Sequence, residues 1–440
     1  MKIYALRTLR DTIIAYASWA RVAVRVRLGM ARTTSTPTVR HLLLIASDFP
    51  PYISGGVYRP LAFIKYAVKH GWRITVLTYE TQDNVYPSGT QLLKSVPPEV
   101  NVLRLPAPNL APSFNWYPKI QGEDLLQALN LFEGAVDRLA AEPPTLVMAT
   151  GPLFYSFVTA YYLSKYCGAK LVLDYRDEWT EWPFGIFTIG KSDYRWERRC
   201  LRAATLVFFT TESQRRQQLR VFPELDGDKC HLMPNGWEPS DFSESPDATR
   251  PAVDMVKRIV LTHAGVFGGH INTIGFLGTL RLVLERREDL RRRLKLCLVG
   301  IKDAKTLDFL RDFPFPSVIE MTDQVPKVEA TRLMKNSTAL LLIYSGSFER
   351  YIPGKLYDYL AAGRPVLVFG EKGEACDIVR RFGAGLVVPP DHPAALEAAL
   401  DTLGEEPLRL KRDDDGLGLW LSEHTRDRMS RRMLDVINQL

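Results

Sequence analysis

The stretch YIPGKLYDYLAAGRPVLVF, residues 351–369, decides the fold class of this 440-residue chain. It predicts a helix that begins near Gly354, because Pro353 suits a first helical turn, where its missing N–H costs nothing. Gly363 is the kind of residue that ends a helix, and the apolar run that follows is typical of a buried strand. A helix that leads directly into a buried strand indicates a parallel α/β sheet.

The start of this predicted helix also carries candidate ligand groups. Free backbone N–H groups at a helix start, together with Lys355, form a natural binding place for a phosphate-bearing ligand. Asp358 follows one helical turn later and is placed to hold a ribose hydroxyl. A packed helix–strand unit with a solvated lysine is the equally open alternative, because helix starts of this kind are common.

Short apolar runs alternate with helical stretches along the whole chain from His41 onward. Strands are expected at residues 41–47, 73–79, 100–105, 145–150, 170–175 and 205–210, and again at 258–264, 294–299, 317–321, 338–343, 365–369 and 385–388. A segment rich in Pro, Ser and acidic residues, 237–254, separates the two series and is typical of an interdomain linker. We therefore expect an α/β protein with two doubly wound Rossmann-like domains that face a cleft.

The expected domain organisation has five parts. They are a basic amphipathic segment at 1–40, an N-terminal domain at 41–240, a linker at 241–256, a C-terminal domain at 257–412 and a C-terminal helix at 413–440. A length of 440 residues is too great for one core of the usual size, which supports two domains. Hydrophobic and charged contents of 46% and 24% match an ordinary globular protein. Five widely spaced cysteines show neither metal-ligand nor disulfide spacing, so a reducing cytosol is expected.

The net charge of +7 lies in the first 40 residues, which hold eight Lys or Arg and only one acidic residue, Asp11. The rest of the chain is balanced, so a nucleic-acid partner is not favoured. Arginines alternate there with Ile, Tyr, Trp and Val, as in a basic amphipathic helix on an anionic membrane surface. No apolar run reaches spanning length, and arginines interrupt any signal-peptide core. A loosely ordered extension or a wrongly assigned start codon is the alternative.

Two loops of the first half follow predicted strands, where ligands bind in open parallel sheets. In DFPPYISGGVYRP (48–60), Gly55 and Gly56 would let the backbone approach a ligand, and Arg59 could meet an anion, although a plain structural turn is also open.

The second loop reads Arg176-Asp177-Glu178-Trp179. A charged cluster directly after a buried strand favours a cleft. Asp177 is the candidate base for an attacking hydroxyl. Its open alternatives are a helix cap or an ion pair with Arg176.

Two loops of the second half carry glycine and positive charge. In HAGVFGGHINT (263–273), Gly265 would allow close approach of a diphosphate, and His270 could add a donor, although a lone histidine is usually structural. This loop lacks the dinucleotide fingerprint, so NAD is not favoured. Arg350 precedes the Gly354-Lys355 helix start. Three such loops from two domains fit a diphosphate held in a cleft between them.

Several familiar motifs are absent from the sequence. It contains no GxxxxGK[ST] phosphate loop, no HExxH and no GxSxG. The acidic run at 413–415 does not follow a buried strand, and we interpret it as a solvated loop rather than a metal site.

After residue 40 the chain resembles the GT-B glycosyltransferases, specifically family 4 and its bacterial surface-polysaccharide subgroup. The segments that carry the resemblance are the Gly-Gly loop with its helix (48–78), GPLFYSFVTAYYLSK (151–165), LVLDYRDEWTEWPF (171–184), MPNGWEPSDF (233–242) and IPGKLYDYLAAGRPVLVF (352–369). The resemblance implies a UDP- or GDP-sugar donor bound mainly by the second domain, and a lipid-linked or polysaccharide acceptor bound mainly by the first. It also implies transfer with retention and without a metal or another cofactor.

The resemblance also assigns residues. Asp358 matches the carboxylate that holds the ribose, the segment Gly354, Lys355 and Leu356 matches the amides that meet the diphosphate, and Val325 matches the position whose backbone meets the base. Asp177 lies in the acceptor-side segment, where a base or sugar contact is expected. Arg59, Arg176 and Trp179 are also expected on the acceptor side.

The sequence departs from the family pattern at two places. Many members have two Glu residues separated by seven; here Asp358 takes the second place and Arg350 the first. The Arg and Lys common after the first strand of the second domain are missing from GVFGGHINT, so we expect Lys355 and Arg350 to stabilise the leaving diphosphate. The departures leave open a catalytically inactive nucleotide-sugar-binding subunit of an assembly complex. A GT-B nucleotide-sugar epimerase, which shares the fold but needs no acceptor, is the other open alternative.

Overall fold

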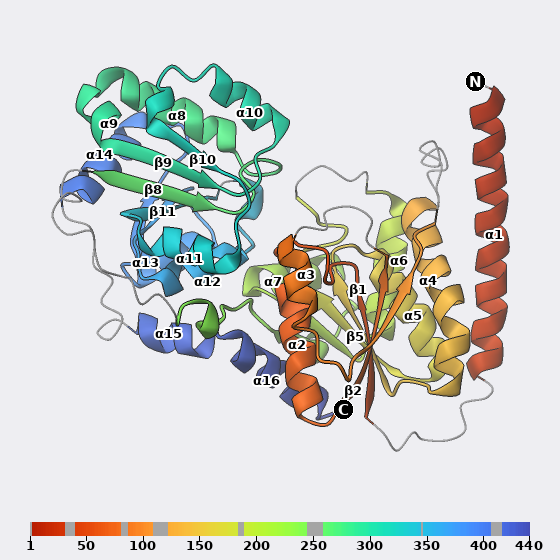
Figure 1. Cartoon of the computed structure of the whole chain (residues 1–440). Coiled ribbons are helices and arrows are strands. Elements are labelled where there is room, and N and C mark those ends of the chain that lie inside the picture. The colour runs from red at the N-terminus through yellow and green to blue at the C-terminus, as the bar shows by residue number, and fades with distance from the viewer. Residues whose placement is uncertain are drawn as a thin grey trace. The chain divides into compact units, whose positions relative to one another are not determined.

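The computed structural model describes residues 2–30, 40–80, 87–108, 122–183, 189–243, 258–344, 346–405 and 416–440. The chain forms two units, one of Met1–Pro234 with Ser430–Leu440 and one of Asn235–Met429 (Figure 1). Most of the predicted linker and the acidic run at 413–415 lie outside the described residues.

The first unit is built on a seven-stranded sheet in the order β3-β2-β1-β4-β5-β6-β7, with every neighbouring pair parallel. Its strands are β1 (His41–Ala46), β2 (Arg73–Tyr79), β3 (Asn101–Leu105), β4 (Leu146–Gly151), β5 (Lys170–Tyr175), β6 (Leu206–Phe209) and β7 (Cys230–Leu232). Its helices are α1 (Lys2–Met30), α2 (Tyr58–Lys69), α3 (Pro87–Leu93), α4 (Gly122–Ala141), α5 (Tyr155–Cys167), α6 (Lys191–Ala203) and α7 (Glu212–Val221). Both faces of β1 are buried, as expected for a parallel strand covered by helices.

The second unit holds a six-stranded parallel sheet in the order β10-β9-β8-β11-β12-β13. Its strands are β8 (Ile259–Ala264), β9 (Leu294–Val299), β10 (Ile319–Thr322), β11 (Ala339–Ile343), β12 (Val366–Phe369) and β13 (Gly385–Val388). Its helices are α8 (Thr273–Arg286), α9 (Glu288–Arg293), α10 (Ala304–Arg311), α11 (Lys327–Lys335), α12 (Gly354–Ala362), α13 (Glu374–Arg381), α14 (Pro393–Glu405) and α15 (Leu417–Glu423). The two sheets confirm the predicted pair of Rossmann-like folds and all twelve predicted strands. Only the three-residue β7 was not predicted.

The stretch that decided the fold forms the expected helix and strand, α12 and β12. Pro353 is the residue before the first helical one, with φ −57° and ψ 135°. Gly363 ends the helix in the left-handed conformation, with φ 70°. Leu356 and Leu360 are fully buried on the inner face, so packing fixes the helix against the sheet.

The single C-terminal helix predicted within residues 413–440 forms as two helices, α15 and α16 (Arg426–Ile437). The break occurs because the backbone of Trp237 replaces helical hydrogen bonds. Its N–H donates to His424 O at 3.1 Å, and its carbonyl accepts from the Arg426 N–H at 2.9 Å. The last eleven residues belong to the first unit, where Met433, Leu434 and Ile437 are buried. No helix in the described part of the chain is both long enough and apolar enough to cross a membrane.

Helix α1 lies alongside α4 and α5 in the first unit (Figure 1). Its inner face contains Ser18, Val22 and Gly29, which are buried, and a Cβ on Gly29 would overlap the Tyr166 ring at 2.4 Å. Residues 2–30 of the basic N-terminal segment therefore form a helix, as predicted, and one face of it packs on the domain.

Candidate functional site

A lysine and a histidine meet at the carboxyl end of β8 in the second unit. His263 is fully buried; its Nδ1 lies 3.0 Å from Leu341 O, and its Nε2 lies 3.0 Å from Lys355 Nζ. Nε2 also lies 3.1 Å from Val266 O, so both ring nitrogens face a carbonyl oxygen. A charged lysine only donates, so beside it the neutral ring carries its proton on Nδ1, and Nε2 accepts from Lys355. The histidine therefore fixes the lysine amine at the end of the strand.

The same amine lies beside Gly265. A Cβ added to Gly265 would stand 3.5 Å from Lys355 Nζ, and the glycine has φ +117°, which side chains rarely adopt. The structure thus brings together Gly265 and Lys355, two residues that the sequence predicted for one diphosphate site. His263 was missed, because it lies inside an apolar strand and carries no local motif.

Burial sets the protonation of this pair. It lowers the pKa of Lys355 to about 8. Burial and the neighbouring Lys355 charge hold the pKa of His263 well below its usual range. At neutral pH the histidine is therefore neutral and the lysine mostly charged. The result is one positive charge in a desolvated place, where an anion would be bound strongly.

The start of α12 adds backbone donors to this charge. Within the described residues, the amides of Gly354 and Lys355 make no hydrogen bond, whereas the Leu356 amide donates to Pro353 O at 2.9 Å. Leu356 was expected to offer its amide too, but it is already engaged and its side chain is core. Two free amides and an ammonium group at a helix start are groups of the kind that bind anions in proteins.

Asp358 has one paired and one unpaired carboxylate oxygen. Lys327 Nζ pairs with Oδ2, while Oδ1 is buried and has no hydrogen-bond partner among the described residues. Gln324 Oε1, beside Val325, is also buried without a partner in the part of the chain that the structure describes. A buried acceptor without a donor costs about 1–3 kcal/mol, which a ligand hydroxyl or N–H would recover.

The other predicted residues of this unit lie near these loops. His270 is exposed in the loop after β8, and Arg350 is half-buried in the turn before α12. The nearby Gly269 amide donates to Asp303 Oδ2 at 2.7 Å, and a Cβ on Gly268 would overlap that carboxylate at 2.4 Å. The Gly268-Gly269 pair of this loop is therefore explained by packing against Asp303. Roles for His270 and Arg350 stay predictions.

In the first unit, Arg59 is committed to the fold. Its guanidinium donates to Asp174 in two bonds of 2.7 and 3.0 Å and to Pro234 O at 2.8 Å. Thr150 donates to the same carboxylate, and the ion pair is nearly fully buried. The expectation that Arg59 meets an anion is corrected, because its donors already have partners.

Arg176 and Gly56 form another structural contact. Arg176 donates to Gly151 O at 2.8 Å and to Pro152 O at 2.9 Å, and it pairs with Asp48 at 3.4 Å. A Cβ on Gly56 would lie 1.8 Å from Arg176 Nη1, so this glycine is needed for the packing of the guanidinium. These contacts correct the acceptor-side role expected for Arg176. They also account for Gly56 without a ligand.

Trp179 likewise belongs to the core. It is buried and stacks on Phe154, with ring centroids 5.3 Å apart, rather than facing a substrate. Gly55, by contrast, is exposed, and a Cβ there would meet nothing within 4 Å.

Asp177 is the acceptor-side residue whose carboxylate makes no hydrogen bond within the described residues. It is half-buried after β5, and burial, opposed by the Arg176 charge, raises its pKa to about 6. Its loop is held by the fully buried Glu197, which accepts from the Thr180 N–H at 3.1 Å and from Tyr175 Oη at 3.0 Å. No local sequence pattern pointed to Glu197, because its partners come from three different segments.

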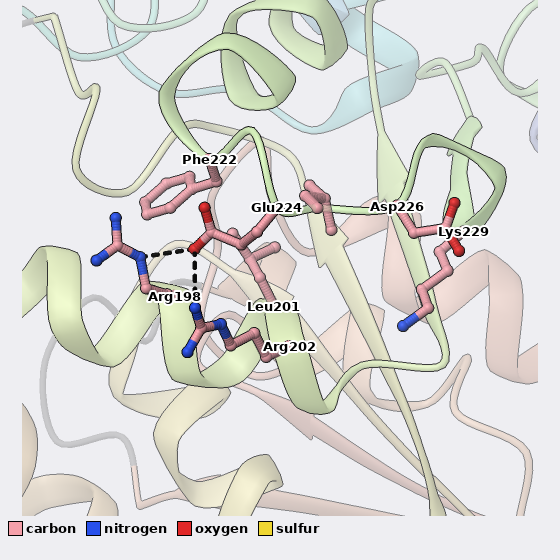
Figure 2. A pocket seen from close by; sticks show the side chains of 8 residues that line it. Arg198, Leu201, Arg202, Phe222, Glu224, Asp226 and Lys229 are labelled. Carbon is pink, nitrogen blue, oxygen red and sulfur yellow. Dashed lines mark ion pairs between the residues drawn. The ribbon is translucent and has the colours of Figure 1, made fainter.

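A small hollow of about 100 Å³ lies in the first unit (Figure 2). Its two arginines pair with one glutamate, Arg198 with Glu224 at 2.6 Å and Arg202 with Glu224 at 3.8 Å. It contains none of the predicted site residues and carries no part of the site. Among the described residues, no three His, Cys, Asp or Glu side chains gather as a metal ion would require.

Two family models match the chain and together cover most of it. Residues 54–236 match the glycosyl transferase 4-like domain, and residues 267–406 match the glycosyl transferases group 1. The chain belongs to the GT-B glycosyltransferases of the family-4 type. No curated protein matches it.

Solved structures share the fold along nearly the whole chain. Sucrose-phosphate synthase from Thermosynechococcus elongatus is 14% identical with a TM-score of 0.69, covering 91% of this chain and 98% of that one. Anabaena HepE in complex with UDP-glucose is 12% identical with a TM-score of 0.65, covering 91% and 100%. WaaG, a glycosyltransferase involved in lipopolysaccharide biosynthesis, is 14% identical with a TM-score of 0.60, covering 90% and 99%.

Proposed function

We propose that this glycosyltransferase moves a sugar from a UDP- or GDP-sugar to a lipid-linked or polysaccharide acceptor, with retention and without a metal or other cofactor. The observation that carries the proposal is the Lys355 ammonium, held by His263 beside Gly265 and the free amides of α12. Those groups suit a diphosphate. The complex of the similar Anabaena protein with UDP-glucose favours a uridine nucleotide.

Each candidate residue then has a chemical role. Lys355 neutralises the charge that develops on the leaving diphosphate. The unpaired oxygen of Asp358 accepts a ribose hydroxyl, and the backbone at Val325 meets the base. In the first unit, Asp177 takes the proton of the acceptor hydroxyl, since a carboxylate with pKa near 6 remains mostly ionised at neutral pH.

A transfer assay tests the activity. The protein is incubated with radiolabelled UDP- and GDP-sugars in the presence and absence of membrane lipids, and labelled lipid or polysaccharide is measured. We expect label to enter the acceptor fraction from one donor. Donor turnover without an acceptor would instead indicate an epimerase, and tight UDP binding with no transfer an inactive assembly subunit.

Affinity for UDP should fall as the pH rises above about 8. A base loses its proton above its pKa, so Lys355, with a pKa of about 8, becomes neutral there and its attraction for the diphosphate is lost. Titration calorimetry should show up to about a tenfold loss of affinity per pH unit, because a single proton is involved.

The matched variant for this pH dependence is Lys355→Arg, which keeps its charge throughout this range. Its UDP affinity should stay level over the same pH interval. If the UDP affinity of the unmodified protein did not change over this pH interval, Lys355 would not be a ligand of the diphosphate.

We propose further that the enzyme is cytoplasmic and binds the inner face of the cell membrane through α1. The face of α1 opposite its packed side carries an exposed stripe at helical spacing, Ile13, Ala17, Ala20, Val24 and Leu28. Ile13, Val24 and Leu28 are 59%, 57% and 57% exposed. Exposed Arg21 and Arg27 flank the stripe. An apolar stripe edged by arginines fits an anionic lipid surface.

Replacing Ile13 and Val24 together by Glu should abolish flotation with anionic vesicles. Each side chain gives about 1.5 kcal/mol or more on burial in lipid, so losing two and adding charge weakens binding more than tenfold. The matched control is Leu307→Glu with Leu419→Glu, two exposed residues of the second unit. Equal flotation of both double variants would contradict membrane binding through α1.

A further inference from the structure

A second cavity lies in the first unit, between α1 and α6, with a volume of about 180 Å³. Tyr16 and Trp19 of α1, Leu125 of α4, and Arg195, Trp196 and Arg199 of α6 line it. It shares no residue with the diphosphate site, and the proposed transfer reaction does not use it.

The two arginines of this cavity are the unusual feature. Arg195 and Arg199 are one helical turn apart, so they lie on the same side of α6. Within the described residues neither has a carboxylate partner, whereas Arg198 and Arg202, on another side of the same helix, both pair with Glu224. Arg199 instead lies over the Trp196 ring, 4.5 Å from its centroid. A guanidinium group without a carboxylate partner is well suited to bind phosphate, because its planar donors match the phosphate oxygens.

The other walls of the cavity are aromatic and continue onto the exposed stripe of α1. Trp19 Nε1 donates to Tyr162 Oη at 3.0 Å, so the indole is held in place. Tyr16 lines the cavity, and helical spacing places it between Trp19 and the stripe that contains Ile13 and Ala20. Tyr16 and Trp19 remain 43% and 44% exposed. Amphipathic rings of this kind suit the boundary between headgroups and acyl chains.

We propose that the cavity between α1 and α6 binds one anionic membrane lipid through its phosphate group. Arg195 and Arg199 hold the phosphate, and Trp19 and Trp196 cover the first carbon atoms. The cavity is too small for a whole lipid, so the acyl chains leave past Tyr16 along the stripe of α1. This inference rests on the proposed membrane association and adds a specific headgroup site to it.

The test compares two double variants of α6 with equal charge loss. Arg195→Gln with Arg199→Gln removes the cavity arginines, and Arg198→Gln with Arg202→Gln removes the paired ones. Binding to vesicles of phosphatidylglycerol in phosphatidylcholine should fall about tenfold or more in the first variant and little in the second. Equal loss in both would overturn the site while leaving membrane binding through α1 intact. Failure of the unmodified protein to bind vesicles would overturn both proposals.

A soluble lipid separates the site from general attraction to a surface. Below its micelle concentration, short-chain phosphatidylglycerol should change the tryptophan fluorescence of the unmodified protein saturably. The Arg195→Gln, Arg199→Gln variant should not respond, and a Trp196→Phe variant should give a smaller change. Inorganic phosphate should compete only weakly; competition equal to that of the lipid would identify a simple anion site and refute the lipid proposal.

Discussion

Replacing Lys355 by Ala should lower sugar transfer by about 100- to 1,000-fold, the usual cost of losing one preorganised group that stabilises a developing charge. Lys355 Nζ is fixed by His263 and lies beside Gly265, where a diphosphate would bring its negative charge. The loss should appear in kcat as well as in KM, because charge on the leaving diphosphate grows in the transition state. Initial rates with the labelled donor measure both.

The control for this variant is Lys305→Ala, which removes an exposed lysine of α10 in the same unit. It should transfer sugar at the rate of the unmodified protein. Thermal unfolding of both variants checks that the fold is intact, since Lys355→Ala also leaves His263 Nε2 without its donor. Activity of a folded Lys355→Ala protein within a few-fold of normal would exclude the assigned role.

Asp358→Asn should weaken UDP binding by about 10- to 100-fold, the range expected when a hydrogen bond to a charged group is lost. The substitution keeps the shape of the side chain, but it removes the charge that pairs with Lys327 and that strengthens a bond to the ribose. Titration calorimetry with UDP measures the loss of affinity. In the transfer assay the substitution should mainly raise the KM for the donor.

Asp377→Asn on α13 is the matched control, because its side chain is 73% exposed and forms a surface ion pair with Arg380. Its UDP affinity should equal that of the unmodified protein. The ribose role of Asp358 is refuted if the two variants bind UDP alike.

Much of the fold could be predicted because its signals are local. Each predicted strand is a short apolar run between turns, and the helix 354–362 has a proline before it and a glycine after it. The three-residue β7 is too short to show a pattern, and the break between α15 and α16 depends on Trp237, far away in the sequence. The alternation within α1 indicated an amphipathic helix, but only packing shows that Val22 lies inside and Val24 outside.

The candidate site was less predictable, because side-chain partners come from distant segments. The glycine loop drew attention to His270, while the histidine that contacts Lys355 is His263, 92 residues before it in the sequence. Arg59 follows a glycine pair in a loop after a strand, as an anion-binding arginine would. Its actual partner is Asp174, which lies 115 residues away in the sequence. A structural arginine such as Arg59 can therefore be distinguished from a ligand-binding lysine such as Lys355 only when the partners of both side chains are known.

The structure of this protein in complex with UDP tests the central claim most directly. We predict that the β-phosphate lies within hydrogen-bonding distance of Lys355 Nζ and of the Gly354 and Lys355 amides, with a ribose hydroxyl on Asp358 Oδ1. UDP bound elsewhere on the chain, with Lys355 still contacting only His263, would contradict it.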